Sequence, residues 1–571
     1  MSRRMDLDSN RRYGRGTYGV LHIALVVPLV ALACAADVLP GRRAAPPRLA
    51  VVVVVDQMRA DYLERFGHLF EGGLARLLSE GMRFTEAHQD HARTVTCPGH
   101  ATIATGVVPG RNGIVGNDYF DRTEGRSVYC AEDEDAPLLG LPDAEGRSPL
   151  RLRREGLADW HRARYPDARI VSVAIKDRAA IMLGGREPDG AYWYHETPGG
   201  LVTSEYYASE LPDWVRDFDA PGRVASYWSV GWDRIGPEAA YVDLTREDAW
   251  DVEGEGGPFT FPYVFEEMYP DGSADDPGPA FRDDFRHTPY ADELVLQFAR
   301  AAVEAEGMGT DDVPDLLLIG ASAADYIGHR WGPYSHEVQD YYLRLDGYLS
   351  DLFDYLDERV GAENWSLVFT SDHGVAPAPE ESVRRGETAR RVPSSEHVAF
   401  LRGLLGEALN EIDPDPRPRL RWLAGAYILP PRPGGSLDLD EEVVRELRRA
   451  IERRLEQADY IDEALTADEV LEADLWDPGL AGLFRRSHDP ERSPDVMMHI
   501  APLYLVGSTP ATHGSAHLYD THVPLIFLGG GAEPGVHADR VRTVDVAPTL
   551  AEMLGVPVPG DLDGRALPLR P

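Results

Sequence analysis

Short apolar runs alternate along the chain with longer segments of mixed polarity. Several runs rich in β-branched residues are typical of parallel strands buried on both faces, namely Arg48–Asp56, Arg169–Lys176, Asp315–Gly320, Ser366–Thr370 and Val523–Leu528. Segments with apolar residues at helical spacing lie between them, such as Gly72–Glu80, Tyr290–Glu306 and Val338–Val360. This alternation predicts an α/β fold, in which a doubly wound, mostly parallel central sheet has helices on both faces.

Two stretches break the alternation. Residues of about 187–285 are rich in Gly, Pro, Trp, Tyr and Asp, and they predict an irregular insertion. Residues of about 377–508 contain Pro-rich loops and an amphipathic helix, Glu441–Ala458. We interpret this second insertion as a cap packed near the carboxyl ends of the strands. Residues 37–571 are therefore expected to form a single α/β domain with two insertions.

The first 36 residues have the pattern of an export signal. Five Arg residues precede or flank an apolar run, Val20–Ala33, that is short for a membrane span. Ala33-Cys34-Ala35 offers a cleavage site, so we expect a signal peptide over residues 1–36 and a periplasmic or secreted protein. A lipid anchor on Cys34 and a retained membrane anchor are the alternatives. No later stretch is long and apolar enough to predict a stable membrane span.

Composition changes this picture in three respects. The 571 residues include 96 Asp and Glu against 57 Lys and Arg, and a formal charge of −39 argues against a nucleic-acid partner. An anionic small molecule stays possible as a substrate, because a bound cation can reverse the field in one cleft. Lys occurs once, at Lys176, which makes it a candidate for a role that needs a compact point charge. Beyond residue 36 the only cysteines are Cys97 and Cys130, and whether they form a bridge stays open.

Potential metal ligands follow several of the predicted strands, at the edge where doubly wound sheets bind their ligands. Asp325 and His329 are four residues apart and would share one face of a helical turn. A carboxylate at the end of a buried strand must be paired or coordinated, since burying a lone charge is costly. The ligand types suit two Zn²⁺ ions, although Mn, Fe or Co could occupy such sites. The full candidate set is Asp56, Asp325, His329, Asp372, His373 and His513.

A candidate nucleophile lies in Thr94-Val95-Thr96-Cys97-Pro98-Gly99-His100. A helix is expected to begin near Pro98, and the free amides at its start would favour an anion. The Thr96 hydroxyl would then lie where a phosphoryl oxygen and a metal meet, and metal coordination can turn it into an attacking alkoxide. Thr94 is the competing hydroxyl and Cys97 the competing nucleophile. The alternative role for Thr96 is that of a helix N-cap.

Together these motifs, in this order, resemble the alkaline phosphatase superfamily. The C-terminal segment Val544–Gly555 also resembles its closing strand and helix, and the similarity runs from about residue 48 to the end. The nearest resemblance is to bacterial phosphate-irrepressible alkaline phosphatases of the PafA type, which use Thr as the nucleophile. The resemblance implies two metal sites: one zinc on Asp325, His329 and His513, and a second on Asp56, Asp372, His373 and the Thr96 oxygen.

Branches of this superfamily differ in their substrates. In sulfatases a modified Cys or Ser stands two residues before Pro, whereas here Thr96 holds that position and Cys97 is out of register. The nucleotide pyrophosphatase and phosphodiesterase branch combines Thr with a downstream Asn, which Asn117 matches, so this pair does not separate diesterases from monoesterases. Lys176 and Arg178 resemble the Lys-x-Arg element of the PafA-type monoesterases. Because they are two residues apart at a strand end, we expect both side chains to face the same way and to reach the phosphoryl oxygens. A monoester carries an extra unesterified oxygen, whose charge fixed cations would stabilise.

We therefore expect a phosphate monoester hydrolase that works by in-line displacement through a covalent phospho-threonine on Thr96. Asn117, Lys176 and Arg178 would bind the non-bridging oxygens. Small-molecule phosphate monoesters are the expected substrates of a monomeric protein. The alternatives are a phosphodiesterase or nucleotide pyrophosphatase, a sulfatase or phosphotransferase, and a module that binds metal or phosphate without catalysis.

Overall fold

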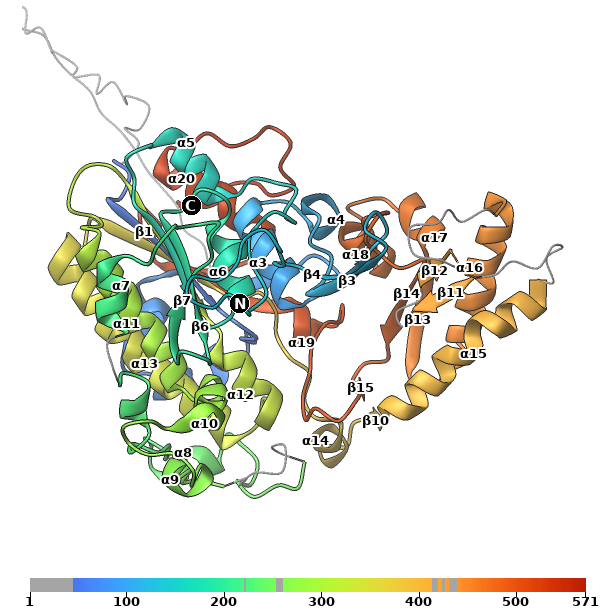
Figure 1. The fold of residues 1–571 in the computed structure, drawn as a ribbon, viewed down its shortest axis with the longest axis horizontal. Helices are drawn as coiled ribbons and strands as arrows, with labels where there is room; N and C mark the ends of the chain where they lie inside the picture. Colours follow the sequence, from blue (N-terminus) through green and yellow to red (C-terminus); the bar gives the residue numbers. More distant parts are fainter. Residues whose placement is uncertain are drawn as a thin grey trace, which may run out of the picture. The chain divides into compact units, whose positions relative to one another are not determined.

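The computed structural model describes residues 45–219, 222–252, 260–412, 420–423, 427–430 and 439–570. The side chains of residues 421–423 are not described. All described residues belong to one compact unit, Ala45–Pro571 (Figure 1). The predicted signal peptide over residues 1–36, with Cys34, lies outside the described residues. Among the described helices, none combines the length and the hydropathy that a membrane crossing needs.

A nine-stranded sheet forms the centre, in the order β17-β2-β16-β9-β1-β8-β5-β6-β7. Four of the five predicted strands are β9, β1, β8 and β5, which are adjacent in this order. Each of them is parallel to its neighbours among these four. The α/β prediction with a mostly parallel sheet is thus confirmed. The strand bounds are β1 Leu49–Val55, β2 Met82–His88, β5 Ile170–Ala174, β6 Gly190–His195, β7 Gly200–Val202, β8 Asp315–Ala321, β9 Trp365–Thr370, β16 His522–Gly529 and β17 Gly535–Arg542.

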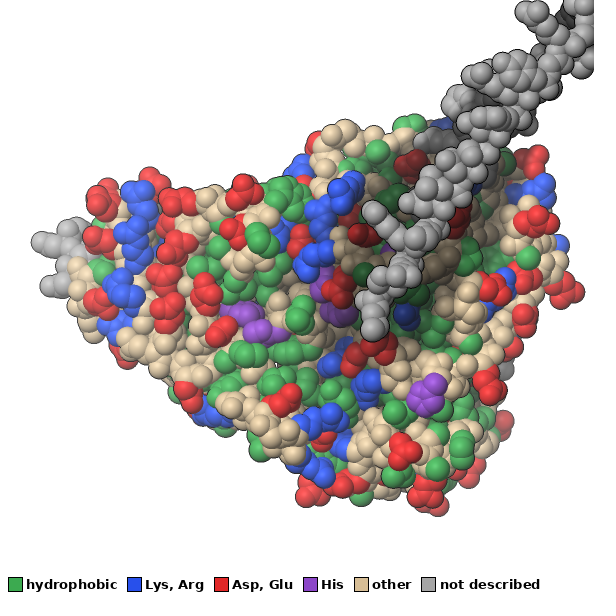
Figure 2. Space-filling model, turned by 180° about the vertical axis from the view of Figure 1, so that it is seen from behind, with side chains coloured by type: hydrophobic (Ala, Val, Ile, Leu, Met, Phe, Trp, Pro, Cys, Tyr) green, Lys and Arg blue, Asp and Glu red, His purple; other side chains and the backbone are tan. Residues whose placement is uncertain are grey.

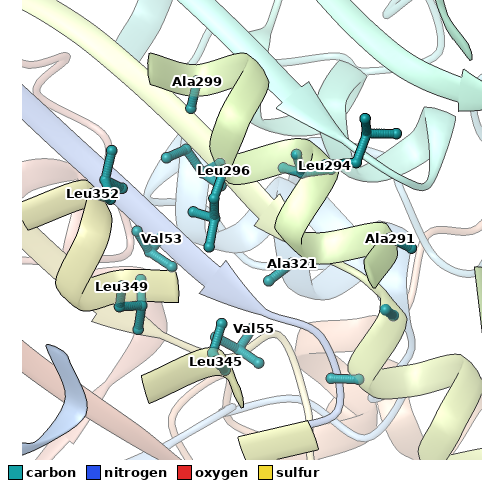
Figure 3. Close-up of a cluster of buried hydrophobic side chains, with 14 of the residues drawn as sticks. Val53, Val55, Ala291, Leu294, Leu296, Ala299, Ala321, Leu345, Leu349 and Leu352 are labelled. Atoms are coloured by element: carbon teal, nitrogen blue, oxygen red, sulfur yellow. The ribbon is translucent and has the colours of Figure 1, made fainter. Parts of the chain in front are cut away.

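Helices bury both faces of the sheet, because alternate residues of each central strand point to opposite sides. On one face Val53 and Val55 of β1 pack with α11 (Tyr290–Ala305) and α13 (His336–Leu356), as Figure 3 shows. On the other face Val52 and Val54 belong to a second core with α5 (Leu157–Arg164) and α20 (Val546–Leu554). Every residue of β1 is buried, which explains why its sequence is an uninterrupted apolar run.

One strand direction differs from expectation. The run predicted as the parallel strand Val523–Leu528 forms β16, which is antiparallel to both β9 and β2. That prediction was wrong in orientation, since an apolar run indicates burial on both faces and carries no information about strand direction.

The two stretches that were expected to be insertions contain regular elements. Within 187–285, β6 and β7 extend one edge of the sheet, and short helices α7 to α10 follow, namely Asp213–Phe218, Glu238–Val242, Phe265–Met268 and Gly278–Asp284. Within 377–508, α15 (Ser394–Ile412) and α16 (Glu441–Leu455) share a separate small core with β13 (Ile461–Thr466) and β14 (Val496–Ile500). Figure 1 shows this group in orange.

Candidate active site

The strands bring the predicted metal ligands to one edge of the sheet. Asp56 directly follows β1, and Asp372 comes shortly after the end of β9, which is parallel to β1. Asp325 and His329 lie on α12 (Ala323–Trp331), the helix that begins after β8. His513 precedes β16, whose start is at the same edge because the strand is antiparallel to β9. Four chain segments that are far apart in sequence therefore supply one cluster.

Two groups of ligand atoms result. Asp56, Asp372 and His373 form one, and His373 Nε2 lies 3.3 Å from Asp56 Oδ1 and 3.3 Å from Asp372 Oδ2. In the other, Asp325 Oδ1 lies 3.2 Å from both His329 Nε2 and His513 Nε2. The spacing of Asp325 and His329 does place both side chains on one helix face. The stacked rings of His373 and His513, 3.6 Å apart, connect the two groups.

The histidine orientations fit metal ligation. The Nδ1 atoms of His329, His513 and His373 each contact a backbone carbonyl, of Ala511, Thr94 and Gly374, at 2.8, 2.8 and 3.0 Å. An Nδ1–H that donates to a carbonyl leaves Nε2 as a lone pair directed at the cluster, which is the usual support of a metal-bound imidazole. Burial also lowers the pKa of His513, which favours the neutral form that a metal requires.

The carboxylates of the cluster carry more negative charge than the described protein groups balance. Asp56, Asp325 and Asp372 are all buried, and Lys176 is the single Lys of the chain. Burial raises the pKa of Asp56 well above its ordinary value, and the nearby Asp372 adds to this while Lys176 opposes it. Asp56 Oδ1, Asp372 Oδ2 and His373 Nε2 are buried without a hydrogen-bond partner. Divalent cations would satisfy these atoms and this charge, so the residues fit a metal centre.

Lys176 lies between the two groups. Its Nζ donates to Asp56 Oδ2 at 2.6 Å and to Asp325 Oδ2 at 2.5 Å, and it is 3.4 Å from Thr96 Oγ1. Burial would raise the pKa of Asp325, but His329 and Lys176 outweigh it and hold this pKa well below the ordinary value. The only Lys of the chain therefore contacts one carboxylate of each group and the candidate nucleophile.

Thr96 is the first residue of α3 (Thr96–Thr105), and Val95 holds the N-cap position. The helix thus begins two residues earlier than expected, and Thr96 is not its N-cap. The start of α3 packs tightly against the loop after β9, since a Cβ on Gly99 would lie 2.4 Å from the carbonyl oxygen of Asp372. Only Gly permits this approach, which brings the Thr96 hydroxyl to the ligand cluster.

Asn117 and the disulfide connect the nucleophile helix to the hairpin of β3 (Asp118–Asp121) and β4 (Arg126–Tyr129). Asn117 Oδ1 accepts a hydrogen bond from the backbone N–H of Cys97 at 2.8 Å. Cys97 is bonded to Cys130, so the pairing that the sequence left open is present. The residues that flank both cysteines, Thr96 and Tyr129, are thereby held near each other.

Arg178 is placed differently from the expectation. β5 ends at Ala174 and α6 (Asp177–Gly184) begins at Asp177, so strand alternation does not align Lys176 with Arg178. Arg178 instead donates to the Tyr129 hydroxyl at 3.4 Å, and Tyr129 donates to Asp177 Oδ1 at 2.6 Å. Both basic residues line a largely polar cavity of about 700 Å³, which gives them access to a common ligand.

Sequence reasoning gave no role to two residues that orient the cluster. His100 Nδ1 donates to the backbone carbonyl of Thr96 at 3.0 Å, which holds the ring 3.1 Å from Asp372 Oδ2, and its position four residues after Thr96 on a helix was the available signal. Gln57 donates through Nε2 to Asp325 Oδ1 at 2.7 Å and through its backbone N–H to Asp372 Oδ1 at 3.3 Å. Gln57 has a φ of 68°, a conformation that favours Gly, and no pattern in the sequence indicated it.

This fold, with a cluster of candidate metal ligands at one edge of the sheet, is that of a hydrolase of the alkaline phosphatase superfamily. Residues 50–520 match the model of the type I phosphodiesterase/nucleotide pyrophosphatase family, so the chain belongs to this family. It is 32% identical over 537 residues to alkaline phosphatase PafA of Elizabethkingia meningoseptica, covering 91% of this chain and 94% of that protein. It is also 32% identical over 537 residues to alkaline phosphatase PhoV of Synechococcus elongatus, covering 92% of each.

A solved structure gives the same result. The crystal structure of wild-type alkaline phosphatase PafA superposes with a TM-score of 0.82 at 30% identity, over 92% of this chain and 99% of that one. The predicted membership of the alkaline phosphatase superfamily and the resemblance to PafA-type enzymes are confirmed, as is the prediction of a phosphate-ester hydrolase.

Proposed function

We propose that the chain is an exported, zinc-dependent alkaline phosphatase that hydrolyses small-molecule phosphate monoesters through a phospho-threonine on Thr96. The observation that carries this proposal is the position of Lys176, whose Nζ lies within 3.4 Å of the Thr96 hydroxyl and contacts a carboxylate of each ligand group. A fixed ammonium at the nucleophile can neutralise an unesterified phosphoryl oxygen, which a monoester has in excess over a diester.

Two metal sites are proposed. Asp325, His329 and His513 would hold one Zn²⁺, and Asp56, Asp372, His373 and the Thr96 oxygen would hold the other. When bound, the ions would supply positive charge that favours deprotonation of a hydroxyl and stabilises a leaving oxyanion. His with carboxylate is a ligand set that Zn²⁺ prefers, and three carboxylates in a buried cluster suit the charge of two divalent ions.

The protein residues then have distinct roles. Thr96 Oγ1 forms a bond to phosphorus while the ester P–O bond breaks and the alcohol leaves, and attack by water next cleaves the phospho-threonine and restores the hydroxyl. Lys176 would hold a non-bridging oxygen beside Thr96, and Arg178 would contact phosphate from the polar cavity. Asn117, whose Oδ1 accepts from the Cys97 amide at the start of α3, would bind a further oxygen.

Replacement of the nucleophile tests the proposal. Thr96→Ala should lower kcat for a nitrophenyl phosphate monoester by at least about a thousandfold, because no group remains to form the covalent intermediate. Thr96→Ser keeps a hydroxyl and is the matched control, with much of the activity retained. Acid-quenched wild-type enzyme should yield a phosphorylated peptide that contains Thr96. Normal turnover by Thr96→Ala, with metal bound, would refute the assignment.

Export is proposed on separate grounds. The basic and apolar pattern of residues 1–36 is typical of a signal peptide, and the Cys97–Cys130 disulfide is typical of an oxidising compartment. We propose a periplasmic or secreted monomer, with a lipid anchor on Cys34 as the alternative. Cell fractionation with detection of the mature N-terminus separates the two cases.

The family description favours one alternative activity, that of a phosphodiesterase or nucleotide pyrophosphatase. A diester has a second ester group in place of one unesterified oxygen, so a buried ammonium beside Thr96 would contribute less to its hydrolysis. Comparison of kcat/KM for a nitrophenyl monoester and a bis-nitrophenyl diester distinguishes the two activities.

A further inference from the structure

A second group of metal-ligating side chains lies on the central sheet, away from the two groups described above. Glu86, His88 and His522 each offer one ligand atom, and the three atoms lie within 4.8 Å of one another. Among the described residues, this is the one further cluster of His, Cys, Asp or Glu that meets that spacing outside the active site. The function proposed above gives it no role.

Strand geometry creates this cluster. Glu86 and His88 are two residues apart on β2, so their side chains point to the same face of the sheet. His522, the first residue of β16, is the direct antiparallel partner of His88. The two imidazole rings stack with their centroids 4.8 Å apart. Two ligands at alternate positions of one strand and a third on its neighbour can bind a single ion from one side.

The ring environments suit ligation. His522 Nε2 donates to the carbonyl of Thr85 at 2.7 Å, which fixes the ring and leaves Nδ1 as a lone pair. His88 is 2% exposed, and its Nδ1 has no hydrogen-bond partner. His88 Nε2 is 3.5 Å from Glu86 Oε2, and Glu86 is exposed, which gives an ion a route from solvent.

Nearby charges have opposite effects on a cation here. Arg540 of β17 is paired in register with Glu86, so its positive charge lies beside the cluster and opposes a bound cation. Its guanidinium is 60% exposed and lies 3.9 Å from Asp90 Oδ1, a loose pairing that solvent screens. Arg540 therefore weakens cation binding without occupying the ligand positions, and we expect a lower affinity than at the buried cluster of three aspartates.

We propose that Glu86, His88 and His522 form an additional Zn²⁺ site that joins the end of β2 to the start of β16. Two imidazoles and one carboxylate are a usual Zn²⁺ set, and three protein ligands leave a position for water. The site adjoins the loop that leads from the active site, since the backbone N–H of Ala60 donates to the carbonyl of His522 at 3.3 Å. A bound ion would link the end of β2 to the start of β16 and so stabilise this pair of strands.

Metal stoichiometry tests the proposal. The full-length processed protein is stripped with a chelator, dialysed against excess Zn²⁺, and its zinc per chain is measured by plasma mass spectrometry. Glu86→Gln and His522→Gln should each bind about one equivalent less than wild type, because each removes one of three ligands. The control is His537→Gln, which alters a His of β17 that lies against Phe84 outside the cluster, and it should match wild type.

Two further measurements make the result decisive. Since Glu86 is exposed, Glu86→Gln should fold normally and keep its phosphatase activity, so its loss of zinc would report the site alone. Excess Ca²⁺ in place of Zn²⁺ should leave the site empty, because two imidazoles disfavour Ca²⁺. Equal zinc content in wild type, Glu86→Gln and His522→Gln at saturating Zn²⁺ would overturn the proposal.

Discussion

At the scale of single residues, Lys176 combines a proposed catalytic role with a structural one. It lies 3.4 Å from the candidate nucleophile and donates to two buried carboxylates. Arg could not make these contacts in the same way, because its planar fork needs more room than a single ammonium. A chain that otherwise uses Arg for its basic residues therefore keeps its one Lys at a buried position between two carboxylates.

Lys176→Ala should separate monoesters from diesters. We expect kcat/KM for a monoester to fall by about 10²–10³, as for loss of one charged donor at a transition state, and the value for a diester to fall by less than about tenfold. The matched control is Arg286→Ala, since Arg286 lines the same cavity and lies over Tyr326. Zinc content is measured in both variants. Equal losses on the two substrates would contradict the role assigned to Lys176.

At the scale of elements, the disulfide fixes the start of α3 to the end of the β3–β4 hairpin. It closes a loop with a sequence separation of 33, for which chain entropy predicts about 4 kcal/mol of stabilisation. The double variant Cys97→Ala/Cys130→Ala should unfold at lower denaturant and lose activity, because Thr96 and Asn117 lie at the two ends of this connection. A phosphine reductant should destabilise wild type to a similar extent. If it also destabilised the double variant, the effect would not come from this bond.

Glu337 of α13 should make stability depend on pH. It is buried, accepts a hydrogen bond from the Tyr263 hydroxyl at 2.6 Å, and burial raises its pKa from 4.5 to about 8. Between these values the folded state retains a proton that the unfolded state releases, so stability falls as pH rises through this window. Glu337→Gln should remove this loss, amounting to a few kcal/mol.

The measurement is the free energy of unfolding at pH 5 and pH 8.5. The difference between Glu337→Gln and wild type should grow at the higher pH, while the exposed control Glu358→Gln should follow wild type at both. A constant difference across this range would show that Glu337 does not titrate with the predicted linkage.

The elements differ in how far their sequences predict them. β1, β5, β8 and β9 were predicted because strands buried on both faces need continuous apolar residues. β2, β6, β7 and β17 were missed. β17 has mostly exposed or half-buried residues, so its sequence lacks the apolar run. The orientation of β16 depends on the path of the preceding chain, which no local pattern records.

The residues of the site also differ in how far the sequence predicts them, because local spacing predicts only contacts between residues that are close in sequence. Asp325 and His329 are close in sequence, and helical spacing alone brings them together. The contact of Lys176 with Asp56 joins strand ends that are 120 residues apart, and it was not predicted, because the resemblance suggested only that Lys176 binds phosphate. Gln57 and the Tyr129–Asp177–Arg178 chain depend on loop conformations after the strands end, which residue types do not specify.

At the scale of the whole molecule, charge and metal binding are connected. The chain carries a formal charge of −39, and Figure 2 shows acidic side chains over one face, interspersed with basic ones. Mixed surface charges are screened by water and salt, whereas the three aspartates at the sheet edge are buried, where repulsion is stronger. The buried cluster, rather than the acidic surface, should therefore determine how the protein responds to metal removal.

Chelation should lower thermal stability as well as activity. Each ion bound to the folded state alone contributes about 4 kcal/mol when its free concentration is a thousand times its Kd. We expect the Tm to fall after treatment with a strong chelator and to recover on addition of Zn²⁺, as measured by calorimetry. Asp372→Asn should reduce the size of this change, because it removes one ligand and one buried charge. An unchanged Tm after complete removal of zinc would contradict a metal centre in this cluster.

The distribution of the ligands along the chain has a consequence for biogenesis. The first proposed ligand is Asp56 and the last is His513, which precedes the insertion of β16 into the sheet between β9 and β2. A partly synthesised or partly translocated chain therefore lacks one imidazole until nearly all of it has emerged. If these residues bind metal as proposed, tight capture of the metal, and with it hydrolytic competence, would be delayed until the last strands insert.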